Sequence, residues 1–219
     1  MRILLSSDKF KGALSAQGVA QSCEKALQSV FPGAVFDTCP IADGGEGTTE
    51  AMVAALRGVW RETTVLDAQA RPRLARYGWV PAPQVAILEM SAASGLALVQ
   101  DRPLQPKLAS TFGTGEMLLA AMASGARKII IGIGGSATND GGLGVAVALG
   151  WRFFRADGST FQPTLETVLA AVRMESPSHP LPEILVACDV DNPLLGPRGA
   201  TRVYGPQKGV QDFTWFEER

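Results

Sequence analysis

The feature that most constrains this chain is a strand pattern, a glycine-rich loop and a helix pattern, which follow one another over residues 127–150. Arg127 and Lys128 lead into the run 129–131, three isoleucines typical of a buried parallel strand. The loop 132–142 holds five glycines, and the small-residue pattern of 143–150 predicts a helix directly after it. Backbone N–H groups of such a loop, with the positive end of the helix dipole, are suited to bind phosphate.

The glycine-rich loop also carries side chains that can bind a ligand. Hydroxyl, amide and carboxylate groups can bind substrate hydroxyls or a metal, and glycines let the backbone approach a ligand closely. A purely structural loop is the alternative interpretation. The candidates for binding substrate or nucleotide in this loop are Gly134, Gly135, Ser136, Thr138, Asn139 and Asp140.

Composition excludes several classes of function. The 219 residues carry 20 basic and 21 acidic side chains, so neither nucleic acid nor an anionic membrane is an expected partner. No apolar run approaches the roughly 18 residues of a spanning helix, and we expect a cytoplasmic protein. The single histidine, His179, excludes a His-rich metal site, and the three cysteines are expected to be small buried hydrophobes.

Strand and helix patterns alternate along the chain, which predicts an α/β fold with two α/β domains and mostly parallel sheets. Residues 1–59 are expected to form the N-terminal part of a Rossmann- or flavodoxin-like domain, with a helix that begins after Ser15. Residues 60–219 are expected to form the second domain. It contains a mixed or antiparallel meander over 61–89 and a helix over 164–172.

Two further clusters lie where early strands should end, which is where ligands gather in α/β folds. Residues 6–12 combine Asp8 with two lysines, one of them Lys11, and could bind a phosphate or a carboxylate. Residues 42–48 contain Asp43 and Glu46, oxygen ligands suited to Mg²⁺, among three glycines. A solvated charged turn is the alternative for each cluster.

Later clusters have similar chemistry. Thr114 lies among hydroxyl residues and glycines before a helix, where it could also be a plain helix cap. Asp189 and Asp191 follow a strand and could meet a metal or orient a hydroxyl, and Lys208 lies in a glycine-rich turn. Acids, lysines, hydroxyls and glycines without a usable histidine favour phosphoryl transfer, where catalysis is chiefly positioning and charge neutralisation.

A dinucleotide-dependent oxidoreductase is the competing class. Residues 132–137 match the G-x-G-x-x-A fingerprint after a strand, and Asp157 falls about twenty residues later, where a ribose-binding acid would lie. The loop, however, continues through 139–142 instead of entering the helix at once. A Walker A pattern is absent from the sequence.

In this order, the clusters resemble the bacterial glycerate kinase family of the glyoxylate- and galactarate-pathway type. The resemblance extends over residues 1–211 and rests on the segments 8–16, 40–48, 89–96, 110–116, 132–142, 187–194 and 204–209. It implies two α/β domains with the active site between them. It also implies ATP- and Mg²⁺-dependent phosphorylation of D-glycerate, with 2-phosphoglycerate favoured over 3-phosphoglycerate as product, and is compatible with a homo-oligomer.

The resemblance suggests roles for the candidate residues. Lys11 and Lys208 become binders of the glycerate carboxylate or of ATP phosphates, and Asp43 and Asp189 become ligands of a metal or of the attacking hydroxyl. The implied catalytic set is Lys11, Asp43 and Asp189. Asp8, Thr114 and Lys208 join the loop residues as binding candidates, and the implied metal ligands are Asp43, Glu46 and Asp191.

The sequence departs from the family pattern at its end. Family members continue through a glycine- and alanine-rich segment and a late Gly-Glu-Gly-Arg…Asp…Gly-Lys motif, which this sequence does not contain. Strands from that segment are expected to complete the sheet that carries the first strand. The sequence is therefore interpreted as a C-terminally truncated member with an incomplete second domain, and two hypotheses stay open: an active kinase, or a truncated, non-catalytic fragment.

Overall fold

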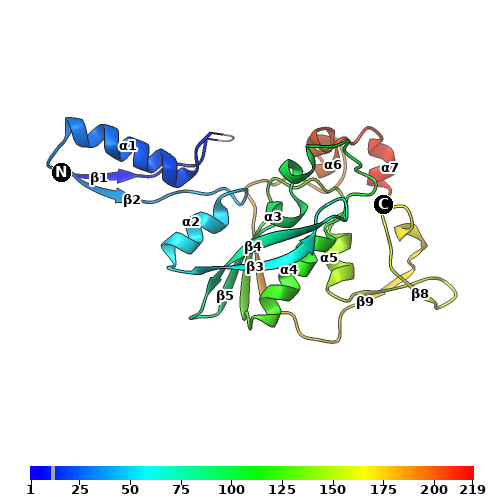
Figure 1. Ribbon diagram of the computed structural model, residues 1–219. Helices are drawn as coiled ribbons and strands as arrows, with labels where there is room; N and C mark the ends of the chain where they lie inside the picture. Colours follow the sequence, from blue (N-terminus) through cyan, green and yellow to red (C-terminus); the bar gives the residue numbers. More distant parts are fainter. Residues whose placement is uncertain (11–12) are drawn as a thin grey trace.

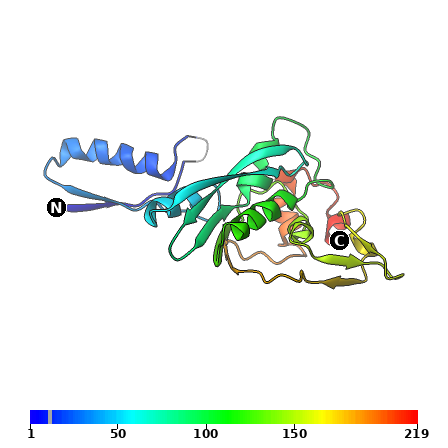
Figure 2. The same ribbon diagram turned by 60° about the horizontal axis from the view of Figure 1, so that its bottom comes forward.

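The computed structural model describes residues 1–10 and 13–219 (Figure 1). An N-terminal unit made of β1 (Arg2–Leu5), α1 (Ala16–Val30) and β2 (Val35–Thr38) extends from a larger body, as Figures 1 and 2 both show. The strands β1 and β2 pair in parallel, with Ile3 opposite Phe36. Ser15 begins α1 as predicted, because its hydroxyl accepts a hydrogen bond of 3.1 Å from the N–H of Gly18.

The larger body is built on a five-stranded sheet in the order β10-β6-β5-β4-β3. Its strands are β3 (Val59–Leu66), β4 (Pro72–Val80), β5 (Val85–Glu89), β6 (Lys128–Gly132) and β10 (Glu183–Ala187). β5, β6 and β10 are parallel, whereas β3 and β4 form the predicted antiparallel arm. The expected isoleucine strand is β6, paired on both sides, and the α/β class with mixed sheets is confirmed.

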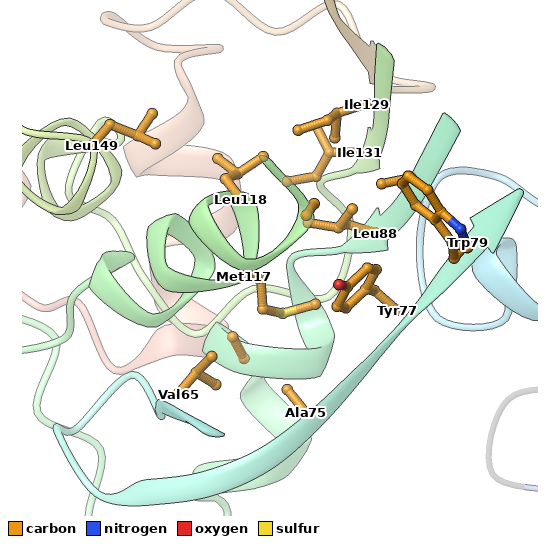
Figure 3. Close-up of a cluster of buried hydrophobic side chains, with 13 residues drawn as sticks. Val65, Ala75, Tyr77, Trp79, Leu88, Met117, Leu118, Ile129, Ile131 and Leu149 are labelled. Carbon is orange, nitrogen blue, oxygen red and sulfur yellow. The ribbon is translucent and has the colours of Figure 1, made fainter. Parts of the chain in front are cut away.

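Helices cover both faces of this sheet. The helix α4 (Phe112–Ala123) buries Met117 and Leu118 against side chains of β4, β5 and β6, and Figure 3 shows this cluster. α5 (Leu143–Ala148) packs on α4. On the opposite face, α2 (Thr48–Ala55) packs Val53 against Val80, Val85 and Ile87. The apolar strand faces thus drive a layered core, and the domain boundary at residue 59 stays a prediction.

The connection from β5 to α4 contains α3 (Ser91–Ser94) and the 3₁₀ turn η1 (Leu96–Val99). After α5, a small antiparallel sheet has the order β8-β7-β9, with β7 (Arg152–Phe154), β8 (Thr160–Phe161) and β9 (Arg173–Glu175). The chain then forms α6 (Ala200–Tyr204), η3 (Pro206–Lys208) and α7 (Phe213–Glu217). In the described ranges no helix is long and apolar enough to cross a membrane.

Two local predictions are wrong. The helix expected over 164–172 is only the 3₁₀ turn η2 (Val168–Ala170), whose N–H groups at 170 and 171 donate three residues back. Thr164, Thr167 and Val168 are β-branched, a class with weak helix propensity. The cysteines are exposed and not buried. Cys23 lies on α1, which packs on one side only, while the other two, Cys39 and Cys188, follow the ends of β2 and β10.

Candidate functional site

A cleft of about 760 Å³ is lined from both the N-terminal unit and the larger body. Four of the predicted segments, 8–16, 40–48, 89–96 and 132–142, contribute to its walls. The glycine-rich loop contributes Gly135. The segments 110–116, 187–194 and 204–209 lie outside this lining. The cleft therefore gathers residues that follow β1, β2, β5 and β6, as expected for the carboxyl ends of strands.

An ion-paired lysine lies at the wall formed by the N-terminal unit. Lys9 Nζ is 3.1 Å from Asp43 Oδ1 and 3.6 Å from Asp8 Oδ1, and its side chain is only 11% exposed. The Gly45 N–H donates to the same Asp43 oxygen and, with Lys9, holds the pKa of Asp43 below its usual value. Asp43 is therefore a carboxylate at neutral pH. The predicted Lys11 lies outside the described residues.

The glycines at the start of the long loop serve a contact between two loops. The Gly134 N–H donates to Gly44 O at 3.1 Å, and a Cβ on Gly134 would lie 2.7 Å from the Cα of Gly45. Gly132 is equally constrained, since its Cβ would lie 2.2 Å from Gly44 O. Gly135 differs: it is exposed, has a φ of +73° and lines the cleft. Of the candidate glycines, Gly135 is the one placed beside a ligand space.

The same loop is fixed to the segment that follows β5. Met90 N–H donates to Gly132 O, Leu96 N–H to Gly135 O and Ala137 N–H to Ser94 O, each at 2.8 Å. In the described part of the chain, the amide N–H groups of Gly135, Ser136 and Thr138 make no hydrogen bond. Unpartnered N–H groups in a fixed loop are donors available to an anion.

Lys208 braces this loop from the C-terminal region. Its Nζ donates to Ser136 Oγ at 2.8 Å and to Thr138 O at 2.6 Å. Burial lowers the pKa of Lys208 to about 8, although the nearby Asp140 carboxylate opposes the shift. The structure thus brings the predicted Lys208, Ser136 and Thr138 together, with the ammonium group inside the loop.

Three other predicted side chains are used within the protein. Asp140 accepts hydrogen bonds from the N–H and hydroxyl of Thr111, both at 2.8 Å. Thr114 is 1% exposed and pairs with the Ser94 hydroxyl at 2.9 Å. Asn139 donates to the Thr201 hydroxyl at 3.0 Å. The cap position of α4 is occupied by Thr111, so the alternative role of Thr114 as the helix cap is wrong.

The predicted metal ligands are not gathered in one place. Asp189 and Asp191 are exposed, lie outside the cleft and make no side-chain hydrogen bond or ion pair within the described chain. Glu46 is exposed and lines the cleft, three residues from Asp43. Residues 1–10 and 13–219 hold no group of three or more His, Cys, Asp or Glu suited to a metal ion. Asp43 and Glu46 are therefore the candidates for binding a cation whose remaining ligands are not supplied by the protein.

Two residues that line the cleft had no individual role among the predicted site residues: Glu89, and Lys9, which was expected only as one of the two lysines of 6–12. Glu89 is the last residue of β5, and its Oε1 accepts the Thr49 N–H at 2.6 Å. The signal available in the sequence was an acid directly after the apolar run 85–88. Lys9 and Lys11 both belong to the segment 6–12, so the sequence alone does not separate their roles.

The dinucleotide-binding interpretation does not hold. That motif needs the helix after the loop to lead into a second parallel strand of the same sheet. Here α5 leads to β7, which belongs to the separate antiparallel sheet. Asp157 is exposed and accepts hydrogen bonds from the Ser159 N–H at 2.9 Å and hydroxyl at 2.6 Å, so it closes a local turn.

Comparisons with known proteins agree on one family. The model of the glycerate kinase family matches residues 3–215. The chain is 45% identical over 214 residues to a glycerate kinase of Bacillus subtilis (strain 168), covering 96% of this chain and 56% of that protein. It is 44% identical over 216 residues to the glycerate 2-kinase of Escherichia coli (strain K12), covering 97% and 57% of the two chains.

A solved structure shows the same fold. The crystal structure of a protein assigned as glycerate kinase 2 from Salmonella typhimurium LT2 matches with a TM-score of 0.86 and 38% sequence identity. The match covers 100% of this chain and 60% of that one. This chain therefore spans a little over half the length of the relatives that it matches. The family model, the relatives and the fold together show that the chain belongs to the glycerate kinase family.

Proposed function

We propose that the cleft is the substrate site of a kinase that phosphorylates D-glycerate with ATP, at the 2-hydroxyl, to give 2-phosphoglycerate. The observation that carries this proposal is a cleft lined by Lys9, Glu46 and Gly135 of the 132–142 loop. Asp43 lies directly behind this wall, ion-paired to Lys9 at 3.1 Å. Relatives named glycerate kinase and glycerate 2-kinase support the substrate and the product.

The residues present fit Mg²⁺ with ATP. Mg²⁺ is commonly held by one or two carboxylates together with substrate phosphates, so a dedicated cage of three acids is not required. Glu46 and the second oxygen of Asp43 are suited to this role, since the first oxygen is bonded to Lys9 and Gly45. When bound, the ion would neutralise charge on the phosphates. The free N–H groups of the loop and Lys208 would hold the phosphate chain.

The test is an ADP-release assay with D-glycerate and Mg·ATP on the purified 219-residue chain. Product identity follows from two coupling enzymes, one specific for 2-phosphoglycerate and one for 3-phosphoglycerate. Release of ADP that depends on D-glycerate, with the 2-isomer formed, supports the proposal. Formation of the 3-isomer overturns the regiochemistry, and no D-glycerate-dependent release by any form of the chain overturns the kinase assignment.

A binding fragment without turnover is the second candidate, and one observation favours it. The face of the β1–β2 pair that carries Leu4 and Val35 leaves them 65% and 57% exposed. Parallel sheets are normally covered on both faces. A fusion of this chain to the remaining segment of the Bacillus subtilis relative separates the two candidates. Turnover by the fusion alone supports the fragment, whereas equal turnover by both supports a self-sufficient kinase.

A further inference from the structure

The cleft contains a carboxylate that no predicted role uses. Glu89 closes β5 in the middle of the five-stranded sheet, opposite Gly132 of β6. Its side chain is half-buried and lines the cleft. No ion pair reaches it from the described residues. A desolvated carboxylate without a cationic partner costs stability, and such groups gather at functional sites.

The hydrogen bonds of Glu89 leave it oriented but not saturated. Oε1 accepts the Thr49 N–H at 2.6 Å, and Oε2 accepts the Ser91 hydroxyl at 3.2 Å. Each carboxylate oxygen can accept a second hydrogen bond. Burial raises the pKa of Glu89, while hydrogen bonding from the Thr49 N–H, the Ser91 and Thr49 hydroxyls and the Gly47 backbone opposes the shift. A raised pKa makes the carboxylate a stronger base than an exposed glutamate.

Its neighbours place Glu89 beside the candidate phosphate site. Ser91 lies against the glycine-rich loop, since a Cβ on Gly135 would lie 3.5 Å from the Ser91 Cβ. Met90, which directly follows Glu89, donates its N–H to Gly132 O at 2.8 Å. Glu89, Ser91 and Gly135 thus line the same cleft, and Gly135 carries one of the free loop N–H groups. A hydroxyl that attacks a phosphate held by the loop would therefore lie near Glu89.

We propose that Glu89 is a catalytic residue: its carboxylate accepts the proton of the attacked glycerate hydroxyl. This inference rests on the proposed kinase function. As the hydroxyl oxygen bonds to the γ-phosphorus, the bond from that phosphorus to the bridging oxygen breaks, and its electron pair leaves with ADP. The proton moves to Glu89 and is later released to water in the cleft.

The first test is the isosteric variant Glu89→Gln, which keeps an acceptor for Thr49 and removes the base. We expect kcat to fall by about 100-fold or more, with little change in the KM for D-glycerate, as is typical when a general base is lost. Glu50→Gln is the matched control, because Glu50 is an exposed glutamate of the same cleft on α2. If kcat is equal in the two variants, the inference is wrong.

The second test is Ser91→Ala, which leaves the contact to Thr49 in place. The Ser91 hydrogen bond lowers the pKa of Glu89, so its removal is expected to move the acid limb of the kcat profile to higher pH. If Glu89 only caps α2, the acid limb of the kcat profile is expected to stay at the same pH. Other charged groups that face the cleft from the surrounding elements are Asp8, Lys9, Glu46, Glu50, Glu62, Arg73 and Arg76. Because Glu89→Gln keeps these groups, loss of the acid limb in that variant assigns the limb to Glu89.

Binding measurements decide the case of a chain without turnover. D-glycerate and 3-hydroxypropionate, which lacks the 2-hydroxyl, are titrated into wild type and Glu89→Gln. We expect Glu89→Gln to weaken D-glycerate several-fold and to leave 3-hydroxypropionate unchanged, since the charged hydrogen bond is the stronger one. Equal effects on both ligands overturn this inference alone. A wild-type chain that neither binds nor phosphorylates D-glycerate overturns the proposed function with it.

Discussion

Asp140 tests whether the protein itself holds the glycine-rich loop in shape. The residue is 8% exposed. Its carboxylate accepts four hydrogen bonds, two from Thr111 at 2.8 Å, one from Gly144 N–H at 3.1 Å and one from Gly142 N–H at 3.2 Å. These bonds join the loop to the start of α4. The perturbation is Asp140→Asn, which keeps the shape and replaces one acceptor oxygen with a donor.

The magnitude follows from the donors that lose a partner. At least one N–H group in a buried site becomes unsatisfied, at a cost of about 1–3 kcal/mol, and the other bonds lose their charge-assisted strength. We expect the free energy of unfolding to fall by about 3 kcal/mol, a large part of the ~5–15 kcal/mol typical of a protein.

Urea unfolding followed by circular dichroism measures this change. With a urea m-value of about 2.5 kcal/mol/M, the midpoint is expected to fall by about 1.2 M. The control is Asp157→Asn, because Asp157 also holds a turn through its carboxylate but is exposed. Asparagine keeps its acceptor oxygen there, so no change in midpoint is expected. Equal midpoints for the two variants would refute the structural role assigned to Asp140.

Three further predictions concern the neighbouring groups. The pKa of Lys208 is lowered from 10.5 to about 8, so between these pH values the unfolded chain binds more protons than the folded one. The free energy of unfolding of wild type is therefore expected to rise by about 3 kcal/mol as pH rises through this range. Lys208→Met should remove that rise in alkaline denaturation curves, and an unchanged slope would contradict it. Gly134→Ala is expected to cost about 1–3 kcal/mol in chemical denaturation through its clash with Gly45, whereas Gly33→Ala, with open space around it, should be neutral; equal costs would refute the loop contact. Chelation of Mg²⁺ should abolish turnover, and Glu46→Gln should raise the Mg²⁺ concentration for half-maximal rate; a rate that ignores both would remove the metal from the proposal.

The sheet could be predicted because its signals are local. The isoleucine run of β6 and the alternating strands of the arm carry their periodicity in a few adjacent residues. The helix expected over 164–172 is a 3₁₀ turn, because the apolar spacing of this segment does not outweigh the weak helix propensity of its β-branched residues.

The site could be predicted by segment but not by role. Strand ends identified the loops that line the cleft, as the sheet topology requires. The role of each loop residue depends on contacts with residues that are distant in sequence. Lys208 is hydrogen-bonded to Thr138, 70 residues away, and the space beside Gly134 is limited by Gly44 and Gly45. Such long-range contacts cannot be predicted from the spacing of residues along the chain. Asp140 therefore looked like a ligand-binding acid although it is bonded within the protein.

The central claim is that the cleft binds the substrates of the family, and calorimetric titration of D-glycerate with Mg·ATP tests it most directly. Ala54→Trp fills the cleft from an exposed position on α2, and Ala26→Trp is the matched control on α1, outside the cleft. We expect saturable binding by wild type and Ala26→Trp, and loss of binding in Ala54→Trp. Binding of equal strength in both variants, or none by wild type, would contradict it.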